Sequence, residues 1–186
     1  IGKRLLDDPR GKLFQEYYRL IKEFNPRLFL FENVTGILSM KGGLFNCIIN
    51  LFESLSYKVD ARVLNTADYG VPQIRKRVII IGKKSDISFS YPKPTHSNII
   101  GNRNPLNLLK FRSLSEAISD LPLIKSGEES FEYKTSPKND FQKMMRKNND
   151  ILNDHNSSRH GQRMINLMDC LSDGGTIKDL PENLKP

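Results

Sequence analysis

A glutamate at the end of an apolar run and two arginines further along the chain are the residues best suited to chemistry. The glutamate is Glu32, and a carboxyl group backed by apolar residues can hold or share a proton near neutral pH. The arginines are Arg75 and Arg77, whose guanidinium groups can clamp a phosphate and hydrogen-bond a base or carbonyl oxygen. Together these residue types favour acid–base and anion-binding chemistry.

Short strands are expected to hold these residues. The run Leu28–Phe31 lies between turn-forming residues and Glu32, which is typical of a fully buried strand, expected to be parallel. Ligands of open α/β sheets lie beyond the carboxyl ends of such strands. Period-two spacing sends Arg75 and Arg77 to one face of an extended segment. The alternatives are a solvated glutamate at a strand end and a solvated pair of arginines at a sheet edge.

Helices and strands around these residues follow from apolar periodicity. Lys12–Phe24 and Leu44–Leu55 carry apolar residues at helical spacing, which predicts two amphipathic helices packed on a sheet. Cys47 falls inside the second helix, where we expect a small buried apolar residue. Alternating apolar residues predict a strand over Tyr57–Leu64, and Val78–Gly82 is expected to be its antiparallel partner.

The second half of the chain has a different composition and weaker apolar periodicity. From Lys83, proline and asparagine residues predict a long connection that leaves the sheet. Short helices are expected over Ser113–Leu121 and Met164–Leu171, and a basic helix over Asp140–Leu152. Basic residues between 143 and 163 could follow a nucleic-acid backbone or lie on a solvated helix face. The histidines His96, His155 and His160 lack the further ligands that a metal site needs, so phosphate contact or plain surface is expected.

Composition sets outer bounds on the protein. The 186 residues suffice for one domain with a real core, and a net charge of +8 with a pI near 9.5 favours a polyanionic partner. Two cysteines, Cys47 and Cys170, have no metal-binding spacing and fit a reducing, intracellular setting. We expect no membrane association, because the chain shows neither a long apolar run nor a secretory leader.

In order and spacing, these segments resemble the DNA cytosine-5 methyltransferase family. Phe31-Glu-Asn-Val34 is similar to its ENV motif, and Gln73-Ile-Arg-Lys-Arg77 is similar to its Q-x-R-x-R motif. Asp8-Pro-Arg-Gly-Lys-Leu-Phe14 resembles the segment that follows the family's catalytic loop. The resemblance is strongest over residues 1–83, and the segments Ser115–Pro122 and Asp179–Leu184 resemble recurrent family segments.

The resemblance implies an α/β fold. Residues 1–83 would form the C-terminal part of a class I S-adenosylmethionine-dependent methyltransferase sheet, which is Rossmann-like. Residues 84–186 would form a connection and an incomplete target-recognition region. Family members carry a Gly-rich cofactor loop and a Pro-Cys nucleophile loop upstream, and the family's spacing puts that cysteine about six residues before Ile1. We therefore interpret the chain as a fragment that lacks the nucleophile and expect it to be inactive alone.

The resemblance also implies roles for the chemical residues. Glu32 matches the residue that holds nitrogen 3 and the exocyclic amine of a flipped cytosine. Arg77 matches the residue that reaches oxygen 2, and Arg75 matches its partner, which stabilises the intermediate and its backbone phosphate. Leu13 matches a residue at the adenine end of the cofactor, although it would serve equally well as core.

Four residues are expected on the DNA side. Asn33 would anchor the loop that carries the cysteine, and Gln73 would shape the turn before the arginines. Arg159 and Arg163 are candidate phosphate contacts.

The activity implied is methyl transfer from S-adenosylmethionine to carbon 5 of a flipped cytosine in duplex DNA, in a bacterial restriction–modification setting. The expected protein is cytoplasmic, acts on DNA, and is a monomer when complete. Two alternatives stay open: a tRNA cytosine-5 methyltransferase, and an inactive or split-enzyme subunit that binds nucleic acid. The sequence does not give the DNA target.

Overall fold

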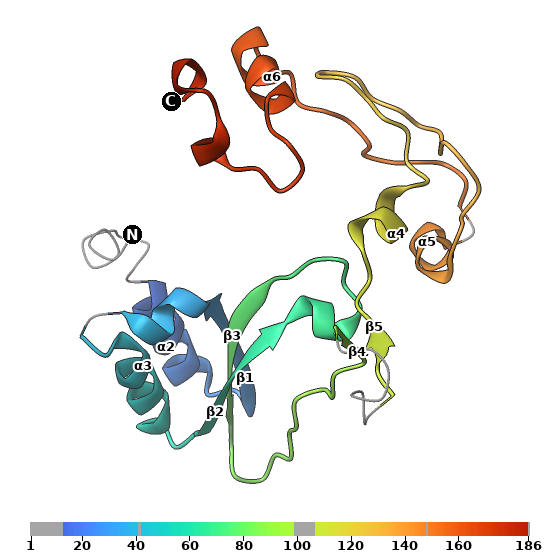
Figure 1. The fold of residues 1–186 in the computed structure, drawn as a ribbon. Coiled ribbons are helices and arrows are strands. Elements are labelled where there is room, and N and C mark those ends of the chain that lie inside the picture. Colours follow the sequence, from blue (N-terminus) through green and yellow to red (C-terminus); the bar gives the residue numbers. More distant parts are fainter. Residues whose placement is uncertain (1–12, 41, 99–106, 148, 186) are drawn as a thin grey trace. The chain divides into compact units, whose positions relative to one another are not determined.

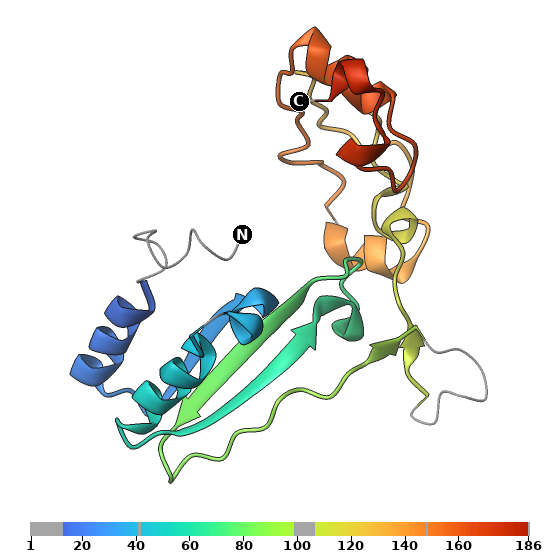
Figure 2. The same cartoon turned by 60° about the vertical axis from the view of Figure 1, so that its left-hand side comes forward.

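A computed structural model of the chain describes residues 13–40, 42–98, 107–147 and 149–185 (Figures 1 and 2). It divides into two compact units, residues 1–113 and 114–186. Residues 84–113 therefore cluster with the sheet, although the sequence suggests a change of region at residue 83. The functions expected of 1–83 and 84–186 stay predictions. The family-like segment at residues 8–12, including the expected helix start at Lys12, lies outside the described residues.

A three-stranded sheet forms the centre of the first unit. It consists of β1 (Leu28–Val34), β2 (Lys58–Asn65) and β3 (Lys76–Lys83), in the order β1-β3-β2. The antiparallel pairing of β2 with β3 is confirmed. The pairing expected for β1 is wrong within the described residues, because its partner β3 is antiparallel. The turn after β2 reverses the chain, and β3 then inserts between β1 and β2, which run parallel to each other.

Two helices cover one face of this sheet (Figures 1 and 2). They are α2 (Leu13–Phe24) and α3 (Leu44–Glu53), and the short 3-10 helix η2 (Thr35–Ser39) follows β1. Apolar side chains of the helices and of one strand face form a core, whose burial stabilises the first unit. The fully buried members are Ile21, Phe29, Ile37, Ile48, Phe52, Tyr57, Val78 and Ile80.

Strand β1 is buried on one face only, so the expectation of a fully buried strand is wrong for the described residues. Phe29 faces the helices and is 4% exposed, whereas its neighbour Leu30 points to the other face and is 53% exposed. Phe29 also explains Gly82 on β3, because a Cβ at residue 82 would lie 2.0 Å from a carbon of the Phe29 ring.

Cys47 is exposed, and the expectation that it is buried is wrong. It lies on α3 one position before Ile48, which is 1% exposed. Successive residues of a helix point about 100° apart, so the helix face that buries Ile48 and Phe52 leaves Cys47 in solvent.

After β3 the chain returns to the sheet, although the sequence predicted a long connection leaving it. The hydroxyl of Tyr91 lies 2.8 Å from the carbonyl oxygen of Ile79, on the sheet face away from the helices. The short strands β4 (His96–Ser97) and β5 (Leu109–Lys110) then pair in parallel. The backbone N–H of Thr95 donates to the carbonyl of Asp68 in the 3-10 helix η3 (Thr66–Tyr69).

The second unit consists of short helices and loops. Its helices are α4 (Leu114–Ile118), α5 (Asp140–Arg146) and α6 (Gln162–Asp169), followed by the 3-10 helices η5 (Ile177–Asp179) and η6 (Glu182–Leu184). Helix α5 is shorter than expected, because Lys147 adopts a left-handed conformation with φ 48°. A helix cannot continue through such a residue at low cost.

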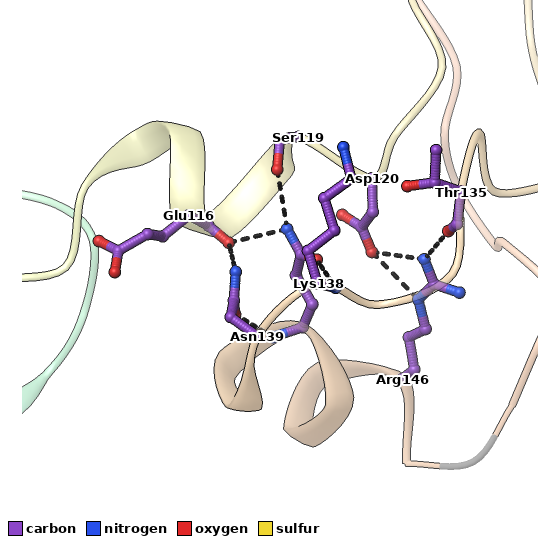
Figure 3. A network of polar contacts seen from close by, with 8 residues as sticks. Glu116, Ser119, Asp120, Thr135, Lys138, Asn139 and Arg146 are labelled. Carbon is purple, nitrogen blue, oxygen red and sulfur yellow. Dashed lines mark hydrogen bonds and ion pairs between the residues drawn. The ribbon is translucent and has the colours of Figure 1, made fainter.

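Arg146 is buried, and it is not part of a basic outer face. Its guanidinium group donates to Oδ2 of Asp120 from Nε at 3.0 Å and from Nη2 at 2.6 Å (Figure 3). It also contacts the Thr135 carbonyl and stacks 3.6 Å from the centre of the Tyr133 ring. This network ties α4 to α5 inside the second unit.

Among the described residues, no helix has both the length and the apolar content to cross a membrane.

Candidate active site

A pocket of ≈ 310 Å³ opens at the end of the sheet where β1 leads out and the β2–β3 turn leads in. It contains all three residues that the sequence singles out for chemistry, Glu32, Arg75 and Arg77. Apolar and small polar side chains complete the lining: Leu64, Thr66, Tyr69, Ile79 and Pro92. A flat substrate with polar edges would meet both an apolar wall and three charged groups there.

Glu32 and Arg77 form an ion pair at this pocket, with Arg77 Nε 3.0 Å from Glu32 Oε1. The strand register explains the contact, because Glu32 lies opposite Ile79 and Val34 lies opposite Arg77, so Glu32 and Arg77 share one face. The side chains are 45% exposed for Glu32 and 23% exposed for Arg77. A partly exposed pair of this kind contributes at most about 1 kcal/mol, so a substrate can replace either partner at low cost.

Arg75 and Arg77 both line the pocket, as the period-two spacing predicts, whereas Lys76 between them does not. Arg77 lies within β3, while Arg75 is the last residue before the strand begins. Nη1 of Arg77 also donates to the carbonyl of Lys76 at 2.8 Å, which limits the directions that the guanidinium group can take. Two positive charges therefore face one concave site.

The turn before Arg75 is supported from behind by His96. Gly70 has φ +85°, which favours glycine, and a Cβ on it would lie 2.6 Å from a carbon of the His96 imidazole. His96 is 7% exposed, and Oγ1 of Thr95 lies 2.8 Å from its Nδ1. Burial, followed by the nearby positive charge of Arg112, lowers the pKa of His96, which favours the neutral ring.

The sequence did not reveal three residues of the pocket wall, Thr66, Tyr69 and Pro92. The expectation of a surface or phosphate-contacting His96 is wrong, because this residue is buried against the turn at Gly70. The Tyr69 hydroxyl donates to the Pro92 carbonyl at 3.2 Å, which joins the turn to a segment expected only as a connection. The one available signal was the turn residue Gly70 directly after Tyr69, next to the paired arginines.

Three other predicted residues lie near the sheet but outside the pocket lining. Oδ1 of Asn33, on β1, accepts the backbone N–H of Val34 at 2.8 Å, so this side chain fixes the exit from the strand. Gln73 lies in the β2–β3 turn, where its carbonyl accepts from the hydroxyl of Thr66 at 2.6 Å. Leu13 is exposed at the start of α2.

Arg159 and Arg163 belong to the second compact unit, so the structure does not bring them together with the pocket residues. Arg163 is exposed on α6, and the aliphatic part of Arg159 packs against Gly127. Nε2 of His155 lies 2.9 Å from the carbonyl of Pro122. Within the part of the chain that the structure describes, no three histidine, cysteine or acidic residues are arranged to hold a metal ion.

The positive charge of the chain is unevenly distributed. Residues 1–113 contain 19 lysines and arginines against 9 acidic residues, whereas residues 114–186 contain 10 against 12. The unit that carries the pocket is therefore strongly basic, and the other unit is slightly acidic. Attraction to a polyanion is expected mainly from the unit that holds the pocket.

Comparison with known proteins gives a consistent result. The family model described as C-5 cytosine-specific DNA methylase matches residues 1–179. The chain is 38% identical to the Type II methyltransferase M.DdeI of Desulfomicrobium norvegicum, over 97% of this chain and 44% of that protein. It is 33% identical to the Type II methyltransferase M1.HphI of Haemophilus parahaemolyticus, over the whole of this chain and 42% of that protein.

A solved structure shares the fold. It is described as a DNA modification methyltransferase encoded within a prophage (E. coli), and it is 26% identical with a TM-score of 0.62. The match covers 89% of this chain and 51% of that structure. The chain therefore spans about half or less of the length of the proteins that it matches.

The sheet and its match to the solved structure place the chain among the α/β methyltransferases, of whose fold it supplies a part. More narrowly, the chain belongs to the C-5 cytosine-specific DNA methylase family.

Proposed function

We propose that the whole protein transfers a methyl group from S-adenosylmethionine to carbon 5 of a cytosine flipped out of duplex DNA, as a bacterial modification enzyme. The observation that carries this proposal is the convergence of Glu32, Arg75 and Arg77 on one pocket. The description of the matching family model, C-5 cytosine-specific DNA methylase, supports DNA over tRNA as the substrate.

The reaction explains why a pocket with these charges is needed. Carbon 5 of cytosine is a poor nucleophile and is shielded in the duplex, so the base must leave the stack. Addition of a cysteine thiolate to carbon 6 makes the ring enamine-like and nucleophilic at carbon 5. We expect that cysteine outside these 186 residues, on the family's Pro-Cys loop. Negative charge then develops at nitrogen 3 and oxygen 2, where preorganised groups can stabilise it.

The charged residues of the pocket can form the hydrogen bonds and charge contacts that this reaction needs. Glu32 would hold a proton at nitrogen 3 and accept a hydrogen bond from the exocyclic amine. Arg77 would donate to oxygen 2, and Arg75 would stabilise the intermediate and its backbone phosphate. The Glu32–Arg77 pair is partly exposed, so exchange of this contact for contacts with the base costs little.

S-adenosylmethionine would supply the methyl group, as it does for this family. Leu13 is the one described residue that we assign to it, at the adenine end, and its side chain is exposed at the start of α2. An exposed leucine can cover an adenine ring but cannot hold a cofactor alone. The proposal therefore assigns one edge of a cofactor site to the described residues.

The decisive experiment compares chemistry with DNA binding in the complete polypeptide. Glu32→Gln keeps the shape but removes an ionisable proton carrier, so single-turnover methylation should fall by roughly a hundredfold or more. Arg77→Ala should have a similar effect. DNA affinity should change little in both variants, because most of it comes from phosphate contacts elsewhere.

Lys76→Ala is the matched control, because Lys76 is adjacent in sequence but does not line the pocket. It should methylate at nearly the parental rate. A parental rate for Glu32→Gln, or equal damage from Lys76→Ala and Arg77→Ala, would contradict the assigned roles. The isolated 186-residue chain with labelled S-adenosylmethionine and cytosine-containing DNA should transfer nothing.

A further inference from the structure

The backbone of Arg75 is held from both sides by the last residue of β2 and its neighbour. The N–H of Arg75 donates to Oδ1 of Asn65 at 3.2 Å. The carbonyl of Arg75 accepts from the N–H of Thr66 at 3.1 Å. Arg75 lies just before β3, one position beyond the last registered pair, Asn65 and Lys76, so these two contacts hold the backbone from which its side chain projects.

The side chain of Asn65 is itself fixed by the turn. Its Oδ1 also accepts from the N–H of Ala67 at 3.5 Å, and its Nδ2 lies 3.4 Å from Oδ1 of Asp68. The amide thus links the start of the turn to its end. Asparagine is disfavoured in strands, and these contacts explain why an asparagine occupies the last position of β2.

Asn65 does not reach the pocket. It lies opposite Lys76 in the register, on the face of the sheet away from Glu32 and Arg77, and it is not part of the pocket lining. Any effect of Asn65 on the chemistry must therefore pass through the backbone that it holds.

We infer that Asn65 is a positioning residue for Arg75: its carboxamide fixes the β2–β3 turn so that the Arg75 guanidinium group enters the pocket. The inference rests on the proposed function, because it takes Arg75 to act on the flipped base. A displacement of about 1 Å in a group that acts on a transition state can cost about a hundredfold in rate. Loss of the carboxamide permits a displacement of that kind.

A double-mutant cycle in the complete polypeptide tests this coupling. Asn65→Ala should lower the single-turnover methylation rate by about ten- to a hundredfold and change the dissociation constant for DNA by less than about threefold. If Asn65 acts through Arg75, then adding Asn65→Ala to Arg75→Ala should lower the rate by less than about twofold further. Rates are compared per folded protein, measured by circular dichroism, and Asn46→Ala on the exposed side of α3 is the control.

Exchanging the side chains of Asn65 and Asp68 provides a test that does not depend on a truncated side chain. Asn65→Asp keeps the acceptor for Arg75 but puts a second carboxylate against Asp68, so the rate should fall. Asn65→Asp combined with Asp68→Asn restores one donor and one acceptor, and it should recover most of the rate. A merely structural asparagine would change stability without a selective loss of rate that the exchanged pair recovers.

The outcomes separate the two proposals. The role of Asn65 alone would be overturned by either of two results. In the first, the double variant loses rate by the product of the two single effects. In the second, Asn65→Ala methylates at the parental rate while Arg75→Ala is slow. A parental rate for Arg75→Ala would overturn the role of Arg75 in the proposed function, and the inference with it.

Discussion

His96 is a buried titratable residue that packs behind the candidate site without lining it. Its imidazole fills the space over Gly70, and its neighbour Thr95 binds the backbone of Asp68. Both contacts fall on the turn that leads to Arg75. The lowered pKa of His96 means that the folded chain accommodates the neutral ring.

Stability should therefore depend on pH through His96. The folded pKa lies below the ordinary value of 6.5, so the folded state binds fewer protons than the unfolded state once the pH falls below about 6.5. The free energy of unfolding should be independent of His96 above this pH and should decrease as the pH falls towards about 5. Urea denaturation at a series of pH values would measure this decrease.

Comparison of variants assigns the effect to the residue. His96→Gln removes the titrating group, so the variant should lose less stability than the parent between about pH 8 and about pH 5. Asn46→Ala, at an exposed residue that does not titrate, should keep the pH dependence of the parent. Equal pH dependence in the parent and His96→Gln would show that His96 is not the group responsible.

At the scale of single residues, the sequence predicts the positions of those site residues that lie at strand ends or alternate along an extended segment. Arg75 and Arg77 share the pocket because residues two apart in an extended segment share a face. The positions of Asn65 and His96 depend on contacts with Arg75 and Gly70, and no local pattern encodes these. Their functions therefore become visible only in three dimensions.

At the scale of elements, the buried pair Asp120–Arg146 determines how α4 and α5 pack. The side chains of Arg146 and Asp120 are only 6% and 4% exposed, respectively. A buried pair adds little net stability over apolar residues of similar size, yet removal of one partner leaves an uncompensated charge. We therefore expect the packing of α4 on α5 to be sensitive to removal of either Asp120 or Arg146 and more tolerant of replacing both (Figure 3).

Asp120→Ala should destabilise the second unit by about 3–5 kcal/mol, because Arg146 would lose its carboxylate. The double variant Asp120→Leu/Arg146→Met should be markedly less destabilised. Hydrogen exchange of the amides in α5 would report both effects, since local opening of this helix exposes them.

Thr135→Val is the control for these variants. The hydroxyl of Thr135 is buried and has no hydrogen-bond partner among the described residues, so its removal should leave amide protection in α5 unchanged or increased. Similar protection in Asp120→Ala and Thr135→Val would mean that the ion pair does not hold α4 and α5 together.

The sequence predicted which segments form helices and strands better than it predicted which faces of them are buried. The hairpin of β2 and β3 follows from the alternation of Val59 and Ala61, and it is confirmed. The four apolar residues before Glu32 predicted burial on both faces, but α2 and α3 cover only the face of Phe29. Helical periodicity put Cys47 in a helix, but the exposed side of that helix depends on where the sheet lies.

At the scale of the whole molecule, β1 and β2 are the two edge strands of the sheet, and β1 is the one with exposed leucines beside its edge. Among the described residues β1 pairs with β3 alone, and on its other side the Leu30 carbonyl accepts from the hydroxyl of Tyr17 at 2.7 Å, so this edge is only partly covered. Leu28 and Leu30 are exposed on the face away from the helices. A partly open edge beside exposed apolar side chains favours association between chains.

The isolated 186-residue chain should therefore self-associate through this part of the sheet. Sedimentation velocity over a series of concentrations should show species larger than a monomer. Leu30→Lys should reduce them, because a lysine on an edge strand disfavours strand addition.

Leu123→Lys in the second unit is the matched control: Leu123 is even more exposed, at 95%, but belongs to no strand. If Leu123→Lys were as effective as Leu30→Lys, general hydrophobicity would explain the association and the edge of β1 would not. A chain that stayed monomeric and unfolded cooperatively would show that β1 needs no further partner strand.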